Sequence, residues 1–264
     1  MHIKETAIGA ARKAGMLLKG HLGRAGKIEF KGDVNIVTEL DRRSEDLIIS
    51  EIRSAFPDHG ILTEESEERK TSTAFRWIID PLDGTTNYAH GFPFFCVSIA
   101  FEEAGEVRLG VVYDPMLDEM FISERGKGSY LNGGLIRVSD VERLDKSLLA
   151  TGFPYDLRSS KENNLDHFKD FTLKAQAIRR AGSAALDLCY IASGRFDGFW
   201  EMKLKPWDTA AAALIVKEAG GTITDFSGGE YSIFEKECLA SNGLIHAGMI
   251  DVLLKRSPKK ALRR

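Results

Sequence analysis

Two aspartates, Asp80 and Asp83, end an apolar segment and are followed at once by Gly84, Thr85 and Thr86. Carboxylates held close together repel one another unless a cation lies between them, and hard oxygen ligands suit a divalent ion. A Gly-Thr-Thr stretch can open a helix whose N–H groups face an anion. This order of residues therefore indicates cations beside a phosphate, and hence chemistry on a phosphate ester.

The same spacing also fits a structural turn, in which Asp83 caps a helix near Gly84 and Asp80 only ends a strand. Two further acids favour the metal interpretation, because both lie at the edge of an apolar segment: Glu64 in ILTEES and Asp208 in PWDTAAA. An aspartyl-phosphate route, known from haloacid-dehalogenase-type phosphatases, uses a DxDGT motif. The longer DPLDGT spacing here favours direct attack by water.

Composition describes an ordinary globular chain of 264 residues with a formal net charge of -3. This charge gives no general attraction to nucleic acid or anionic lipid. The N-terminus lacks the continuous apolar run of a signal peptide, and no stretch approaches transmembrane length. We therefore expect a cytoplasmic protein without a membrane partner. Three isolated cysteines are expected to be reduced and buried: Cys96, Cys189 and Cys238.

The pattern of apolar residues changes near residue 140. Before it, two amphipathic helices and short strands precede an antiparallel meander over residues 94–138. After it, strands alternate with helices that we expect over residues 163–174, 184–192 and 209–219. We predict an N-terminal α+β domain over residues 1–140 with most of the acids, and a C-terminal α/β domain over residues 141–264 with Asp208.

The chain resembles the inositol monophosphatases, a family of magnesium-dependent, lithium-sensitive phosphomonoesterases. The resemblance covers nearly the whole sequence and rests on these segments: GDVNIVTELDRRSE (32–45), ILTEES (61–66), WIIDPLDGTTNYAHGFPFFCVSIA (77–100) and PWDTAAAALIVKEAGG (206–221). The segment ATGFPYD (150–156) is closer to bacterial and archaeal members than to animal ones. The resemblance implies a homodimer and an α+β fold, a layered αβαβα sandwich with an antiparallel sheet in the first domain and a mixed sheet in the second.

The resemblance also implies two to three Mg²⁺ ions in each active site. The first would be held by Glu64, Asp80, the carbonyl of Leu82 and the hydroxyl of Thr85. The second would be held by Asp80, Asp83 and Asp208, and a third, weaker ion would lie near Glu64. The ions would bridge phosphate oxygens and bind the attacking water, whose pKa they lower.

Catalytic and substrate-binding roles follow from the same resemblance. Thr85 would position the water, Asp41 would help to draw off its proton, and Glu64 would act beside them. The phosphate would be bound by the amides of Gly84 and Thr85, and the alcohol by Asp83, Ala184 and Glu201. Lys31 is a candidate counter-charge near the metals, with a solvated loop lysine as the alternative. Tyr155 and Arg158 are candidates for a second phosphate or a dimer contact.

The leading functional interpretation is a Mg²⁺-dependent phosphatase of a small phosphorylated polyol or sugar, with myo-inositol 1-phosphate as the first substrate to test. The enzymatic alternative is fructose-1,6-bisphosphatase, or both activities, since either ester presents the same phosphate to the same cations. An alternative of another class is an interaction protein of the transcription machinery and ribosomal RNA synthesis. The C-terminal tail from Lys255, with six cations and no acid, permits that role, but we expect no nucleic-acid partner because a frayed basic end binds weakly.

Overall fold

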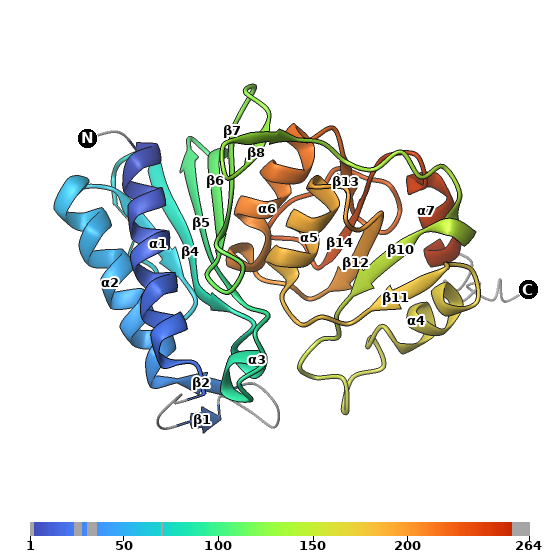
Figure 1. Cartoon of the computed structure of the whole chain (residues 1–264), viewed down its shortest axis with the longest axis horizontal. Helices are drawn as coiled ribbons and strands as arrows, with labels where there is room; N and C mark the ends of the chain where they lie inside the picture. Colours follow the sequence, from blue (N-terminus) through green and yellow to red (C-terminus); the bar gives the residue numbers. More distant parts are fainter. Residues whose placement is uncertain (1–2, 24–27, 31–35, 70, 255–264) are drawn as a thin grey trace, which may run out of the picture.

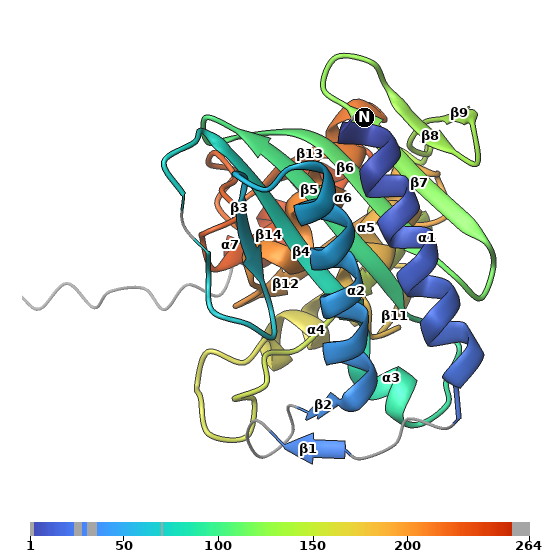
Figure 2. The same ribbon diagram turned by 90° about the vertical axis from the view of Figure 1, so that its left-hand side faces the viewer.

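Two long helices, α1 (Ile3–His21) and α2 (Glu39–Ala55), cover one face of a large sheet (Figures 1 and 2). The computed structural model describes residues 3–23, 28–30, 36–69 and 71–254, so the predictions for Lys31 and the basic tail lie outside the described part. Helix α1 buries small side chains, and Gly15 lies directly against the ring of Tyr113. Small residues let this helix approach the sheet closely. Ala7, Ala10 and Ala14 are fully buried, and Ile3 and Leu17 are partly buried.

The large sheet has seven strands in the described part of the chain, in the order β3-β4-β5-β6-β7-β8-β9. All neighbours are antiparallel except β3 and β4, so the expected meander over residues 94–138 is confirmed and one parallel pair is added at the edge. The strands are β3 (Gly60–Thr63), β4 (Phe75–Asp83), β5 (Cys96–Glu103), β6 (Glu106–Asp114), β7 (Glu119–Glu124), β8 (Ser129–Leu131) and β9 (Gly134–Ile136).

Helices α5 (Ala184–Ala192) and α6 (Pro206–Glu218) form the middle layer (Figure 1). Helix α6 packs on β4 to β7, and α5 packs on both α6 and the second sheet. Gly110 makes the close approach possible, because an added Cβ would clash with the backbone of Ala211. Helix α6 begins earlier than the expected residue 209, because Pro206 suits a first helical turn and its missing N–H is not needed there.

The second sheet has five strands among the described residues, in the order β11-β10-β12-β14-β13, with parallel and antiparallel pairs. Helices α4 (Leu165–Thr172) and α7 (His246–Leu254) cover its outer face. The strands are β10 (Leu148–Thr151), β11 (Ala177–Arg179), β12 (Gly198–Met202), β13 (Thr222–Thr224) and β14 (Glu237–Ser241). Strand β14 and helix α7 were not anticipated from the sequence.

The layers therefore run α, β, α, β, α, which confirms the expected α+β sandwich (Figure 1). Short elements complete the described chain: β1 (Ile28–Phe30), β2 (Ile36–Thr38), α3 (Thr85–Ala89) and a 3-10 turn (Leu144–Lys146). Residue 140 lies between the two sheets in sequence, but the two sheets share the α5–α6 layer. The two-domain division stays a prediction. No described helix is both long and apolar enough to cross a membrane.

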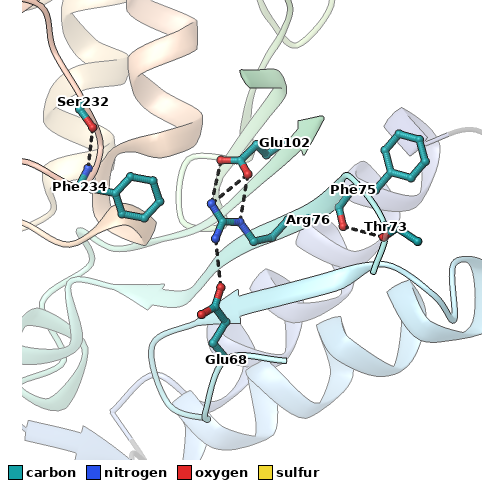
Figure 3. A network of polar contacts seen from close by, with 7 residues as sticks. All are labelled: Glu68, Thr73, Phe75, Arg76, Glu102, Ser232 and Phe234. Carbon is teal, nitrogen blue, oxygen red and sulfur yellow. Dashed lines mark hydrogen bonds and ion pairs between the residues drawn. The ribbon is translucent and has the colours of Figure 1, made fainter. Parts of the chain in front are cut away.

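The start of β4 carries an ion-pair network (Figure 3). Arg76 donates two hydrogen bonds to Glu102, of 3.1 Å from Nε and 3.0 Å from Nη2, and one of 3.0 Å from Nη1 to Glu68. Its guanidinium also lies 5.5 Å from the centre of the Phe234 ring. Each acid thus meets a cation at this end of the strand.

Candidate active site

The other end of β4 carries the first acids of the site. Asp80 pairs with Ser98 of β5 and Asp83 with Cys96, so the register shifts between them. In a regular strand, residues three apart point to opposite faces. A bulge removes that restriction by inserting an extra residue on one strand, and here it lets both aspartates contribute to one site. The Leu82 amide donates to Asp80 Oδ1 at 3.0 Å and fixes the local turn.

Asp80 and Asp208 lie in a field of other carboxylates. Burial raises the pKa of Asp80 well above its usual range, and the charges of Glu64, Asp83 and Asp208 raise it further. The pKa of Asp208 is raised by burial first, and then by Asp83, Glu64 and Glu201. Acids from β4, from the segment after β3 and from the first turn of α6 are therefore close enough to repel one another.

Asp83 connects the two halves of the chain. Its Oδ2 accepts from Ser183 Oγ at 2.6 Å and from the Ala185 amide at 2.8 Å, at the start of α5. Burial raises the pKa of Asp83 to about 6, although the hydrogen bonds from Ser183 and the α5 amides lower it. Ser183 also caps α5 by accepting from the Leu186 amide. One capping serine thus orients an acid of the first sheet.

Thr85 begins α3 and lies between two oxygen acceptors. Its Oγ1 is 3.0 Å from Asp41 Oδ1 and 3.0 Å from the carbonyl of Leu82. Asp41 lies in the first turn of α2 and is buried, so it is not an ordinary surface acid. Gly84 precedes the helix at a φ of 99°, and an added Cβ there would lie 3.0 Å from the Phe94 carbonyl. Glycine is needed at this position because other residues rarely adopt that backbone conformation.

A pocket extends from these residues to the second half of the chain. One wall is formed by residues 83–86, and the opposite walls by the end of β10 with the segment after it, by the end of β12 with the loop after it, by the loop before α5 and by α5 itself. Glu201 lies against Gly152, where any side chain would collide with its carboxylate. The pKa of Glu201 is raised to about 8, mainly by burial and against the effect of Arg180. Tyr155 also lines this pocket.

The donor set fits a hard divalent cation. Glu64, Asp80, Asp83 and Asp208 supply carboxylate oxygens, and the carbonyl of Leu82 faces the same turn. The described residues contain no preassembled group of three or more acidic, His or Cys ligands. The fit instead rests on chemistry: the acids raise one another's pKa, and added positive charge would relieve that repulsion.

Several candidate site residues from the sequence line this pocket, with Asp41, Glu64 and Asp80 beside it: Asp83, Gly84, Thr85, Tyr155, Ala184, Glu201 and Asp208. The amide of Ala184 is among the groups that lower the pKa of Asp83. Arg158 does not line the pocket, and Lys31 lies outside the described residues. The pocket residues that were missed include Gly152, Arg180, Ser183 and Asp187. A signal existed for Asp187, which is a single acid inside the apolar helix segment AALDLCYIA. Nothing in the sequence indicated that Ser183 would bind an acid a hundred residues away.

Comparisons with known proteins agree with this geometry. A family model described as the inositol monophosphatase family matches residues 2–257. The chain is 42% identical to the Nus factor SuhB of Escherichia coli strain K12, over 92% of either chain. It is also 42% identical to the putative Nus factor SuhB of Neisseria meningitidis serogroup B, over 94% of this chain and 96% of the relative.

Solved structures show the same fold. The inositol monophosphatase (IMPase) of Thermotoga maritima is 42% identical with a TM-score of 0.89, over 97% of this chain and 98% of that one. The inositol monophosphatase of Anabaena is 42% identical with a TM-score of 0.87, over 95% and 94%. A more distant structure, 26% identical with a TM-score of 0.82 over 97% of this chain and 99% of that one, is described as an inositol monophosphatase-fructose 1,6 bisphosphatase.

Proposed function

The chain belongs to the inositol monophosphatase family, and from this premise we propose that it is a Mg²⁺-dependent phosphomonoesterase of a small phosphorylated polyol. The first substrate to test is myo-inositol 1-phosphate. Lithium sensitivity and a homodimer are further parts of the proposal. The relatives named as inositol monophosphatases support this substrate class, and the relative described with both activities supports fructose-1,6-bisphosphate as the alternative.

The observation that carries the proposal is the mutual repulsion of acids drawn from distant segments. Glu64, Asp80 and Asp208 come from different elements, yet Glu64 raises the pKa of both aspartates and Asp208 raises that of Asp80. A fold that buries like charges together without a ligand would lose stability. The repulsion is therefore best explained by a site that works with cations in place.

The ions would be held by the residues that supply oxygen ligands: Glu64, Asp80, Leu82, Asp83, Thr85 and Asp208. Bound Mg²⁺ would supply positive charge that neutralises the acids, binds phosphate oxygens and makes water more acidic. Ser183 and the Ala185 amide would keep Asp83 oriented from the opposite half of the chain.

Thr85 and Asp41 would handle the proton of the attacking water. The Thr85 hydroxyl has one proton and two acceptors at 3.0 Å, Asp41 Oδ1 and the Leu82 carbonyl. When it donates to Asp41, its own lone pairs are free to accept from a water molecule. Asp41 is then connected to that water through one hydroxyl, the arrangement that general-base assistance requires.

The proposal is tested with a substrate panel of myo-inositol 1-phosphate, fructose 1,6-bisphosphate and nucleoside monophosphates, each measured with Mg²⁺ and with added Li⁺. We expect the highest kcat/KM with a polyol or sugar ester, and inhibition by Li⁺. Equal, very low rates with every ester would contradict the proposed activity.

A second candidate function is that of an interaction protein in transcription. It is favoured by the name Nus factor, which relatives from Escherichia coli and Neisseria meningitidis carry. These names weigh against our expectation of no nucleic-acid partner. We expect a truncation before Lys255 to keep phosphatase activity and to abolish any nucleic-acid binding through the basic tail. Intact binding after truncation would exclude the tail as the binding segment.

A further inference from the structure

Helix α5 presents one buried acid to the pocket. Asp187 is 1% exposed and lines the same pocket as Glu201 and Arg180. Its neighbours on the helix are mostly apolar. Its Oδ1 finds no hydrogen-bond donor within the part of the chain that the structure describes. The side chain is thus a buried polar group whose partner is missing.

Such a group is costly for the folded protein. A buried carboxyl oxygen without a donor loses its water and gains no hydrogen bond in return. The surroundings add to the cost, because burial raises the pKa of Asp187 well above its usual range and the charges of Glu201 and Asp83 raise it further, with Arg180 opposing them. A donor that arrives with the ligand would remove part of this cost.

The position of Asp187 limits what that ligand group can be. Gly84 and Thr85 in the first wall belong to the phosphate side of the proposed site, whereas Asp187 and Glu201 lie on walls from the second half of the chain. Carboxylates accept hydrogen bonds from hydroxyls and repel a further phosphate. Arg180 offsets part of their charge but is itself solvent-exposed.

We propose that Asp187 is a specificity residue which, together with Glu201, accepts hydrogen bonds from two hydroxyl groups on the alcohol part of the substrate. This inference rests on the proposed phosphatase function and narrows it. It favours the monophosphate of a polyhydroxylated alcohol over an ester without hydroxyls and over a sugar bisphosphate. A carboxylate with a structural role instead accepts hydrogen bonds from the protein, as Asp114 Oδ1 does from the amides of Met116 and Leu117.

The test uses two replacements of Asp187. Asp187→Leu replaces both oxygens by methyl groups on the same branched skeleton, and Asp187→Asn keeps one acceptor. Asp114→Asn is the matched control, because Asp114 is also fully buried with an oxygen, Oδ2, that finds no donor among the described residues, but it lies outside the pocket. For each protein, kcat/KM is measured for myo-inositol 1-phosphate and for phenyl phosphate, and thermal unfolding is recorded in parallel.

We expect the ratio of the two kcat/KM values, polyol to phenyl ester, to fall about 10-fold in Asp187→Leu, since a lost hydrogen bond to a charged group has about this effect. Asp187→Asn should lie between Asp187→Leu and wild type, and Asp114→Asn should keep the wild-type ratio. Asp187→Leu should unfold at the same temperature as wild type or higher, because an unpartnered buried carboxyl has been removed. An unchanged ratio, or a large loss of thermal stability, would overturn the proposal.

Two further measurements test the inference even if the variants misfold or the proposed activity is absent. Wild-type protein is assayed with inositol 1-phosphates that each lack one hydroxyl, and at least two of these hydroxyls should matter. Dependence on one hydroxyl or none would overturn the proposal without any variant. If wild type cleaves neither ester, the proposed activity fails, and calorimetric binding of inositol 1-phosphate then decides the inference: weaker binding by Asp187→Leu supports it, and equal or absent binding overturns it.

Discussion

Strand β4 carries charged groups at both of its ends, but only those at its start are paired with opposite charges of the protein. At the start of the strand, Arg76 satisfies Glu102 and Glu68 with three hydrogen bonds (Figure 3). At its end, the largest charge contributions to the pKa of Asp80 all come from other carboxylates. One strand thus holds a balanced charge network and an unbalanced one.

The difference between the two ends distinguishes acids that stabilise the fold from acids that are available to bind a ligand. The charge of the buried Glu102 is already compensated by Arg76. The bonds from Arg76 hold β4, β5 and the segment around Glu68 together. Acids that raise one another's pKa need positive charge from elsewhere. The unbalanced end of the strand is therefore the place to look for a ligand, whereas the presence of charged residues alone is not informative.

The largest expected effect concerns the unbalanced end. Asp208→Asn should lower kcat/KM by about 100-fold or more, the scale expected when a group that stabilises the transition-state charge is removed. The fold should persist, since volume is unchanged. Steady-state kinetics with circular dichroism checks both points, and Asp145→Asn, an exposed acid paired with Arg143, serves as the control. Full activity of Asp208→Asn would remove this residue from the site.

At the balanced end, Arg76→Met should affect stability instead of chemistry. The Arg76 side chain is 25% exposed and that of Glu102 7% exposed, so the variant leaves a buried acid without its cation. We expect a loss of about 2 kcal/mol in the free energy of unfolding, below the usual cost for a fully buried pair. Denaturant titration measures it. Adding Glu102→Gln should restore part of the loss, and no recovery in the double variant would argue against the pair.

Removing an acid from the unbalanced end should increase the free energy of unfolding instead of lowering it. In metal-free protein, Asp80→Asn relieves repulsion while its side-chain oxygen can still accept from the Leu82 amide. We expect a gain of about 1 kcal/mol in the free energy of unfolding. Added Mg²⁺ should then stabilise wild type more than this variant, because only the form that binds the ion is stabilised by it. A less stable metal-free Asp80→Asn would contradict the claim of repulsion.

The last effect is gradual and is a pH dependence from Glu201. Its pKa is about 8 in the folded protein against an ordinary value of 4.5. The folded state therefore keeps a proton that the unfolded state releases in this window, so stability falls as pH rises from 4.5 towards 8. Glu201→Gln should show a shallower fall in metal-free protein. If wild type and Glu201→Gln lose the same stability as pH rises, then folding does not raise the pKa of Glu201.

The sequence located the acids well because each lies at the end of a recognisable apolar segment. Glu64, Asp80 and Asp208 could be found by local pattern alone. The bulge that aims Asp80 and Asp83 into one site depends on pairing with β5, which no local pattern reports. Strand β14 lies between β13, which directly precedes it in the chain, and β12, which helix α6 separates from it in sequence.

The central claim is that the acids around Asp80 work with a divalent cation, and chelation tests it most directly. Activity on myo-inositol 1-phosphate is measured after dialysis against a chelator and again after Mg²⁺ is added back. We predict that activity disappears in the chelator and returns with Mg²⁺, while Asp208→Asn stays low in both conditions. Wild-type activity that is undiminished by the chelator would contradict the account.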